Sequence, residues 1–203
     1  MTATVEFIFD IAAPNGYLAW YPLKDIAART GARLEVTPVF LGGMHKLTGN
    51  APPMIRDAGV KGKVAYAALE FQRFVDRHGM HRFRMHPALP FNSILLQRVL
   101  AAAADEAQRQ ALVEALLPAV WERNIDCSDA DAVGAELTQA GFDAPALLAA
   151  AQDPAVKARL AENTERAVER GAFGIPTFFV DGEMWFGKER LSQLEDFLGG
   201  GQP

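Results

Sequence analysis

Residues 171–191, GAFGIPTFFVDGEMWFGKERL, decide the fold. Two aromatic and β-branched runs, TFFV and EMWF, are separated only by Asp181 and Gly182. Both of these residues tolerate the positive φ angles of a type I′ turn, so the segment predicts a two-stranded hairpin over residues 177–186. Pro176 stands before the first strand, where a missing N–H does not disturb the ladder. An ordinary edge-strand proline and a cis Ile175-Pro176 bond both fit this pattern, although only ~5% of X-Pro bonds in folded proteins are cis.

The N-terminal end of the chain complements this segment. Residues 5–10, VEFIFD, predict a β-strand, and a helical pattern follows with Pro14 at its first position. A strand, a helix that opens at X-Pro, and a distant X-Pro-Thr before a hairpin and a last helix resemble the thioredoxin fold. In the DsbA-like branch of that fold, a helical domain is inserted between the two halves. The resemblance raises the expectation of a cis bond at Pro176.

The segments between these two ends fit such an insertion. The first helix is expected over residues 15–30, kinked by Pro22, and a second strand over residues 34–41, closed by Gly42-Gly43 and parallel to the first. Amphipathic helical segments follow at residues 64–78, 92–104, 106–122, 129–140 and 144–152.

The helix boundaries in this region have recognisable caps. Ser128, with Asp131 three residues on, is expected to begin one helix, and Asp153-Pro154 the next. We predict an α/β protein with a thioredoxin-like fold and a large inserted all-helical domain, of the DsbA and kappa glutathione transferase type. Residues 1–43 and 153–203 would form the thioredoxin-like domain, and residues 44–152 the insertion.

Composition restricts the class of protein. The chain has 203 residues, 50% of them hydrophobic, and a net charge of −5. Its basic residues are scattered among acids, which argues against a nucleic-acid surface. No apolar run approaches the ~20 residues of a membrane helix, and the start MTATVEFIFD lacks a signal-peptide pattern. A cytoplasmic location without membrane attachment is expected.

The sequence gives little support for chemistry at a cysteine or for a metal site. Cys127 is the single cysteine, so the chain cannot form an internal disulfide or a C-x-x-C redox pair. A small, partly buried loop residue is the simpler interpretation of Cys127. The four histidines, which have no partners at metal-ligand spacing, are expected in solvated loops rather than at a metal: His45, His78, His81 and His86.

Four blocks carry a more specific resemblance. They are FDIAAPNGYLA at residues 9–19, FLGGMHKLTGN at 40–50, RFRMHPALPFNS at 82–93 and FGIPTFFVDGEMWFGKERL at 173–191. In this order they resemble the signature blocks of the 2-hydroxychromene-2-carboxylate isomerases, relatives of kappa-class glutathione transferases. The resemblance implies glutathione as cofactor, bound across the cis-proline loop and the first helix, and a small aromatic hydroxy-acid substrate from aromatic degradation. The thiolate of glutathione would add to the chromene to permit cis-trans isomerisation. Family members are commonly dimers, which leaves a homodimer open here.

The resemblance also implies the cofactor-binding residues. The backbone of Ile175, beside Pro176, would hold the cysteinyl part of glutathione. The γ-glutamyl end would lie on Phe186, Gly187, Lys188 and Glu189. Glu189 can pair with the γ-glutamyl ammonium, and the N–H groups of the last helix suit a carboxylate. The family usually has Asn or Gln followed by Asp where this chain has Lys188-Glu189, and a solvated acid that complements the helix dipole is the alternative for Glu189.

Further polar residues are candidates for the substrate side of the site. By position, Lys46 and Asn50 would orient the substrate and stabilise developing phenolate or enolate charge. Arg56 and Asn92 would bind substrate, with surface chemistry as the alternative for Arg56 and helix capping for Asn92.

Ala13 departs from the family pattern. The family has a serine at this position, before the helix-opening proline, and its hydroxyl hydrogen-bonds the glutathione sulfur. Such a charge-assisted bond contributes ~1.5 to 3 kcal/mol, so its loss lowers the thiolate fraction roughly ten- to a hundredfold. Three functions follow: a glutathione-dependent isomerase, a glutathione transferase that acts on another electrophile, and a non-catalytic glutathione-binding or interaction protein.

Overall fold

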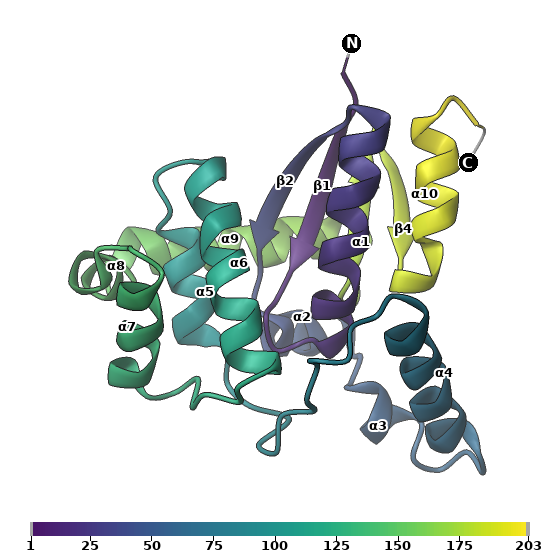
Figure 1. Cartoon of the computed structure of the whole chain (residues 1–203), viewed down its shortest axis with the longest axis horizontal. Helices are drawn as coiled ribbons and strands as arrows, with labels where there is room; N and C mark the ends of the chain where they lie inside the picture. Colours follow the sequence, from purple (N-terminus) through teal and green to yellow (C-terminus); the bar gives the residue numbers. More distant parts are fainter. Residues whose placement is uncertain (1, 202–203) are drawn as a thin grey trace.

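The computed structural model describes residues 2–201, which form one four-stranded sheet and helices around it (Figure 1). The strands are β1 (Thr4–Phe9), β2 (Arg33–Pro38), β3 (Thr177–Val180) and β4 (Glu183–Phe186). Eleven helical elements are described: α1 (Pro14–Thr30), α2 (Leu41–Thr48), α3 (Pro53–Arg56), α4 (Lys63–Arg77), α5 (Ile94–Ala101), α6 (Glu106–Trp121), α7 (Ala130–Gln139), α8 (Ala144–Ala150), α9 (Pro154–Glu169), the 3₁₀ turn η1 (Lys188–Arg190) and α10 (Leu191–Leu198).

The sheet joins the two ends of the chain. Its strand order is β2-β1-β3-β4, with β1 parallel to β2 and antiparallel to β3. Phe9 pairs with Pro38 and Ile8 with Thr177, so the turn after β1 and the loop before β3 leave the same end of the sheet. Because α1 and this loop both start at that end, they come together there.

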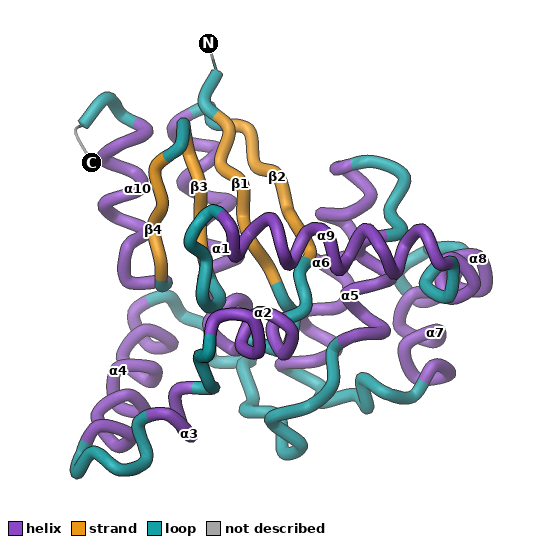
Figure 2. The backbone as a smooth tube through the Cα atoms, turned by 180° about the vertical axis from the view of Figure 1, so that it is seen from behind, coloured by secondary structure: helices purple, strands orange, loops and turns teal. Residues whose placement is uncertain are grey.

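Helices cover both faces of the sheet. Helices α1 and α10 lie on one face, and α9 crosses the other (Figures 1 and 2). Alternation along β1 sends Phe7 to the α1 side, where its ring stacks on Trp20 and Phe178 at 6.2 and 5.3 Å. Ile8 faces the opposite side and belongs to the smaller apolar cluster that contains Ala13 and Ile175.

Helices α2 to α8 all lie between β2 and β3 in the chain. Helices α5 to α8 gather beside the β2 edge, and α3 and α4 extend from the opposite lower side (Figure 1). The predicted thioredoxin-like fold with many intervening helices is therefore confirmed. The division at residues 44 and 152 stays a prediction.

The hairpin matches its sequence signal. Asp181 and Gly182 have φ angles of 49° and 91°, as a type I′ turn requires, and Val180 pairs with Glu183 across the turn. The Ile175-Pro176 bond is cis, and so is Leu89-Pro90.

Two predicted boundaries are wrong, each because of a polar contact. The second strand ends at Pro38, and Gly42-Gly43 lie inside α2 instead of closing the strand, because the Asp10 carboxylate accepts a hydrogen bond from the Leu41 N–H at 2.7 Å and caps α2. At α7 the N-cap is Asp129 rather than Ser128, whose hydroxyl binds Asp126 instead.

Candidate active site

The turn from β1 into α1 places Ala13 at the N-cap of α1. Its φ and ψ are −90° and 112°, its carbonyl accepts the first helical bond from Gly16 N at 2.8 Å, and no side chain caps the helix. Ala13 is 5% exposed. A methyl group therefore occupies the position at the helix N-terminus where the resemblance implies a hydroxyl.

The loop before β3 packs directly against this turn. Ile175 shares the buried apolar cluster of Ala13. A Cβ on Gly16 would lie 3.5 Å from Ile175 Cγ2, so the first turn of α1 and the cis-proline loop are in close contact. Pro176 O accepts a hydrogen bond from Gly187 N at 2.9 Å, which ties the loop to the residue before η1.

Two polar features at this junction lack partners within residues 2–201. Neither the N–H nor the C=O of Ile175 takes part in a hydrogen bond with the rest of the described chain. Asn15 Oδ1, in the first turn of α1, is buried and also has no partner there. Buried polar groups are normally satisfied, so these atoms fit a bound ligand or water at the junction.

Asn50 is brought to the same loop. Its Nδ2 donates to Phe173 O at 2.8 Å, and its Oδ1 accepts from Ala51 N at 2.9 Å. The Phe173 and Phe186 rings lie 4.4 Å apart and are 37% and 38% exposed. A Cβ on Gly174 would lie 3.0 Å from Phe186 Cε2 and 4.0 Å from Asn50 Nδ2, so Asn50 and this exposed aromatic pair lie beside the same point of the loop.

The remaining predicted cations differ in their surroundings. Lys46 is exposed in the last turn of α2, one turn before Asn50. Arg56 forms a two-pronged ion pair with Asp57, at 2.8 and 2.9 Å, and Lys63 binds the same carboxylate. These two cations hold the pKa of Asp57 well below its usual range. The Arg56 guanidinium is therefore engaged in a local ion pair.

Asn92 lies one residue before Ser93, the N-cap of α5, and binds the first N–H of that helix. Its Oδ1 accepts from Ile94 N at 2.9 Å at the start of α5, and the residue is exposed. This contact is the helix-capping alternative that the sequence left open.

Lys188 and Glu189, both expected to hold the γ-glutamyl group, differ in their exposure to solvent. Lys188 is 5% exposed and lies over the rings of Phe74 and Phe71, with its Nζ 5.2 and 6.0 Å from their centroids. The same Nζ pairs with Glu189. The Glu189 side chain is 54% exposed, so of this pair only the carboxylate is open to solvent.

Sequence reasoning missed the group that holds the Ala13 turn. Asp10 is fully buried, and its carboxylate accepts from Ala12 N, Leu41 N and Ser93 Oγ at 2.9, 2.7 and 3.0 Å. Burial raises the pKa of Asp10 to about 6 against these three donors. An acid directly after a largely buried strand, three positions before the N-cap Ala13, was the available signal.

Other titratable groups are less suited to chemistry. Burial raises the pKa of the Cys127 thiol to about 12, so this residue stays protonated. Burial lowers the pKa of His45 and His78. Across residues 2–201, no cluster of three His, Cys, Asp or Glu side chains could hold a metal ion. Within the same residues, no helix is long and apolar enough to cross a membrane.

Comparisons with known proteins place the chain in a family. A family model, the DSBA-like thioredoxin domain, matches residues 4–199. A 2-hydroxychromene-2-carboxylate isomerase of Sphingobium xenophagum is 31% identical over 200 residues, which cover 98% of this chain and 99% of that one. Human glutathione S-transferase kappa 1 is 29% identical, over 97% of this chain and 91% of its own.

Solved structures give the same grouping. The structure of a 2-hydroxychromene-2-carboxylate isomerase superposes with a TM-score of 0.83 at 30% identity, and covers 97% of this chain and 95% of the other. With a DSBA-like domain over nearly the whole sequence and relatives above 30% identity over nearly their whole length, the chain belongs to the 2-hydroxychromene-2-carboxylate isomerase family within the DsbA-like thioredoxin fold.

Proposed function

We propose that this protein is a glutathione-dependent cis-trans isomerase of the 2-hydroxychromene-2-carboxylate isomerase type, acting on intermediates of aromatic degradation. The single observation that carries the proposal is the junction of the α1 N-terminus with the cis-proline loop, where Ile175 keeps its backbone groups unpaired. An extended thiol peptide can pair with such a backbone segment as an added strand. The family membership supplies the reaction class.

The residues at this junction fit glutathione. The backbone of Ile175 would hold the cysteinyl unit, as a short antiparallel pairing, and Glu189 would receive the γ-glutamyl ammonium. Lys188 is buried with its Nζ over the rings of Phe71 and Phe74, so its contribution would come through its backbone and through the orientation of Glu189. When bound, glutathione would supply a thiolate nucleophile that the protein itself lacks.

On the substrate side, polar and aromatic groups face the same loop. Asn50 fixes the Phe173 carbonyl and would position the substrate beside the thiol. Phe173 and Phe186 are exposed together and suit an aromatic ring. Lys46, exposed in the last turn of α2, would attract the substrate carboxylate and stabilise the negative charge that develops. Arg56 and Asn92 remain proposed substrate-binding residues, and each would have to leave a local partner to bind the substrate.

The direct test follows the isomerisation of 2-hydroxychromene-2-carboxylate by absorbance, with and without glutathione. We expect turnover that requires glutathione and falls at least tenfold in Asn50→Ala. Arg190→Ala, an exposed change just beyond Glu189, is the matched control. Turnover that is equal without glutathione would contradict the proposal.

Two alternatives retain specific support. The kinship with kappa glutathione transferases favours conjugation of glutathione to another electrophile, which is recognised by a stable thioether product rather than an isomer. The methyl group of Ala13 at the helix N-cap favours a non-catalytic glutathione-binding or interaction protein, which would bind glutathione without turning over either substrate. Because the reaction needs reduced glutathione, the reducing cytoplasm is the proposed compartment.

We also propose that the chain forms a homodimer through the α3–α4 surface, defined as Ile55, Val60, Val64, Tyr66 and Leu69. These side chains are between 43% and 60% exposed. In α4, Val75 is the single buried residue. Exposed apolar groups that form a contiguous patch mark an interaction site.

A further inference from the structure

A hollow lies at the outer edge of the sheet, and none of its lining residues belongs to the candidate active site. It has a volume of about 180 Å³. The last residues of β2, the end of α5, the first turn of α6 and one side of α9 form its walls. Three of its lining residues are arginines: Arg109, Arg159 and Arg166.

The charge of this hollow is opposite to that of the protein. The whole chain carries a net charge of −5, yet no Asp or Glu is among the residues that line the hollow in the described chain. Arg109 is neutralised by Glu106 at 2.5 Å. Arg159 and Arg166 form no ion pair with any of residues 2–201. Two guanidinium charges therefore remain uncompensated around one small volume.

Hydrogen bonds to the protein fix each guanidinium in place. Arg159 Nη1 donates to Ala101 O at 2.8 Å, at the end of α5. Arg166 Nη2 donates to Asn163 Oδ1 at 2.9 Å, and Asn163 is itself held, with its Nδ2 on Pro38 O at 3.1 Å. A guanidinium has five N–H donors, so most of these donors remain free.

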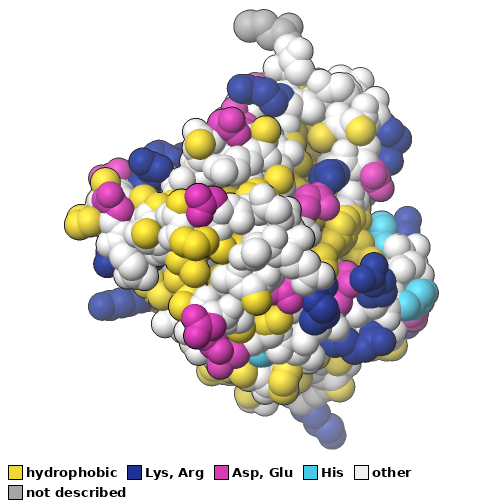
Figure 3. Space-filling view, turned by 60° about the vertical axis from the view of Figure 1, so that its left-hand side comes forward, with side chains coloured by type: hydrophobic (Ala, Val, Ile, Leu, Met, Phe, Trp, Pro, Cys, Tyr) yellow, Lys and Arg dark blue, Asp and Glu magenta, His cyan; other side chains and the backbone are white. Residues whose placement is uncertain are grey.

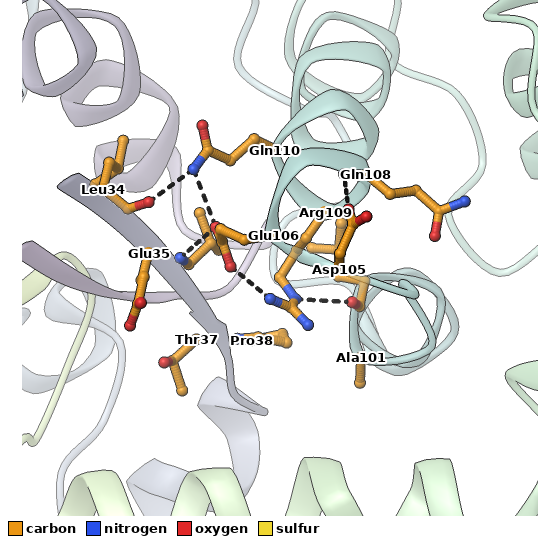
Figure 4. A network of polar contacts seen from close by, with 12 residues as sticks. Leu34, Glu35, Thr37, Pro38, Ala101, Asp105, Glu106, Gln108, Arg109 and Gln110 are labelled. Carbon is orange, nitrogen blue, oxygen red and sulfur yellow. Dashed lines mark hydrogen bonds and ion pairs between the residues drawn. The ribbon is translucent and has the colours of Figure 1, made fainter. Parts of the chain in front are cut away.

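Arg109 is anchored in the same way (Figure 4). Its Nε donates to Leu100 O at 3.2 Å, and its Nη1 meets Glu106, whose other oxygen accepts from Val36 N at 2.8 Å. The figure shows this side chain stretched between the β2 edge and the end of α5. The cations are thus preorganised, which lowers the entropy lost when an anion binds.

Size and charge together restrict the ligand. Ligand pockets for larger molecules have about 300 to 1,000 Å³, so a volume near 180 Å³ suits a small group rather than a nucleotide or a peptide. Planar guanidinium forks match the oxygen atoms of phosphate in pairs. We propose that Arg109, Arg159 and Arg166 form a binding site for a small divalent oxyanion of the phosphate type, either free phosphate or the phosphate group of a small ester.

The test is calorimetric titration of the full chain with inorganic phosphate, at an ionic strength held constant with sodium chloride. We expect saturable binding that weakens at least tenfold in Arg159→Gln/Arg166→Gln. Lys157→Gln removes a positive charge from the same helix outside the hollow, and should bind phosphate within twofold of the unchanged protein. Circular dichroism should show that both variants keep their helix content.

Titrations with other ligands show whether the bound group is free phosphate or a phosphate ester, and whether the site prefers a divalent anion. Glycerol phosphate that binds more tightly than inorganic phosphate would indicate an ester, and the reverse would indicate free phosphate. Acetate that binds as tightly as phosphate would overturn the assignment to a divalent ligand. Absence of saturable binding, or equal binding in the double variant, would overturn the site itself.

Discussion

Ala13 is the residue that bears most directly on the proposed reaction. The residue is 5% exposed and belongs to the same apolar cluster as Ile175, at the position where the resemblance implies a hydroxyl. Ala13→Ser would place a donor beside the glutathione sulfur. We predict a roughly ten- to a hundredfold rise in turnover near neutral pH, because the hydroxyl lowers the thiol pKa.

The same substitution could act only as a helix cap, because serine at an N-cap stabilises a helix by ~1 kcal/mol relative to alanine. Turnover and thermal unfolding therefore need to be measured on the same sample, with Ala13→Gly as the variant without a hydroxyl. Higher stability in Ala13→Ser without any gain in turnover would favour the non-catalytic alternative.

Asp10 makes a prediction about pH. Burial raises its pKa from 3.8 to about 6, so the folded protein holds this proton more tightly than the unfolded chain does. Its contribution to stability is complete below the unfolded pKa and is lost as the pH rises through about 6. Asp10→Asn removes this titration.

We expect the free energy of unfolding of the unchanged protein, minus that of Asp10→Asn, to fall by up to ~3 kcal/mol between about pH 4 and about pH 7. Urea denaturation across this range measures it, and other carboxylates cancel in the difference. A difference that is constant with pH would show that Asp10 titrates normally.

At the scale of elements, α4 is held to the body of the protein by few contacts. Val75 is its single buried residue, and Lys188 of η1 places its Nζ over the rings of Phe71 and Phe74. A cation over an aromatic ring contributes ~0.5 to 2 kcal/mol, depending on how far it is desolvated. Lys188 therefore acts as an anchor for α4.

Lys188→Met keeps the apolar stem and removes the charge. We predict that amide hydrogen exchange in peptides from α4 becomes about 2- to 30-fold faster, because local opening is easier by that interaction. Peptides from β1 and α6 in the same variant serve as the control and should be unchanged. Equal acceleration in all peptides would mean that Lys188 stabilises the whole fold instead.

Individual elements also show what the sequence could predict. The hairpin at Asp181-Gly182 depends on backbone angles that two adjacent residues determine, so a local pattern was sufficient. The end of β2 depends on Asp10, which lies 31 residues away from Leu41. A contact of that kind has no local signal, and the predicted boundary at Gly42-Gly43 was wrong for that reason.

In the candidate site, too, contacts between residues that are distant in the sequence could not be predicted from local patterns. The Asn50 side chain donates to the Phe173 carbonyl, a contact that the sequence did not predict, and its role toward the substrate stays a prediction. The burial of Lys188 could not be predicted, because α4 lies more than a hundred residues earlier in the chain. The ion pair of Arg56 with Asp57 joins neighbours, yet an arginine beside an acid has no distinctive pattern among charged loops.

At the scale of the whole molecule, exposed polar and apolar groups are distributed unevenly. Figure 3 shows basic and acidic side chains interspersed on one face, with hydrophobic groups between them. The most exposed large apolar residues, Ile55 and Tyr66, lie on the α3–α4 surface at 60% and 59%. This distribution is the basis of the proposed homodimer.

If this surface joins two copies, Ile55→Asp/Tyr66→Asp should convert a dimer into a monomer by repulsion and loss of apolar contact. Sedimentation velocity at several concentrations measures the change. Met85→Asp, also an exposed apolar position but outside this surface, is the matched control. A monomer in the unchanged protein at high concentration would contradict the proposed interface.

The central claim is that the junction of α1 with the cis-proline loop binds glutathione. The most direct measurement is calorimetric titration of glutathione into the unchanged protein, Glu189→Gln and Glu183→Gln, the last being an exposed acid on β4. We predict saturable binding to the unchanged protein and to Glu183→Gln, weakened at least tenfold in Glu189→Gln because the γ-glutamyl ammonium loses its partner. No binding to any of the three proteins would contradict it, and the family membership would then extend to the fold alone.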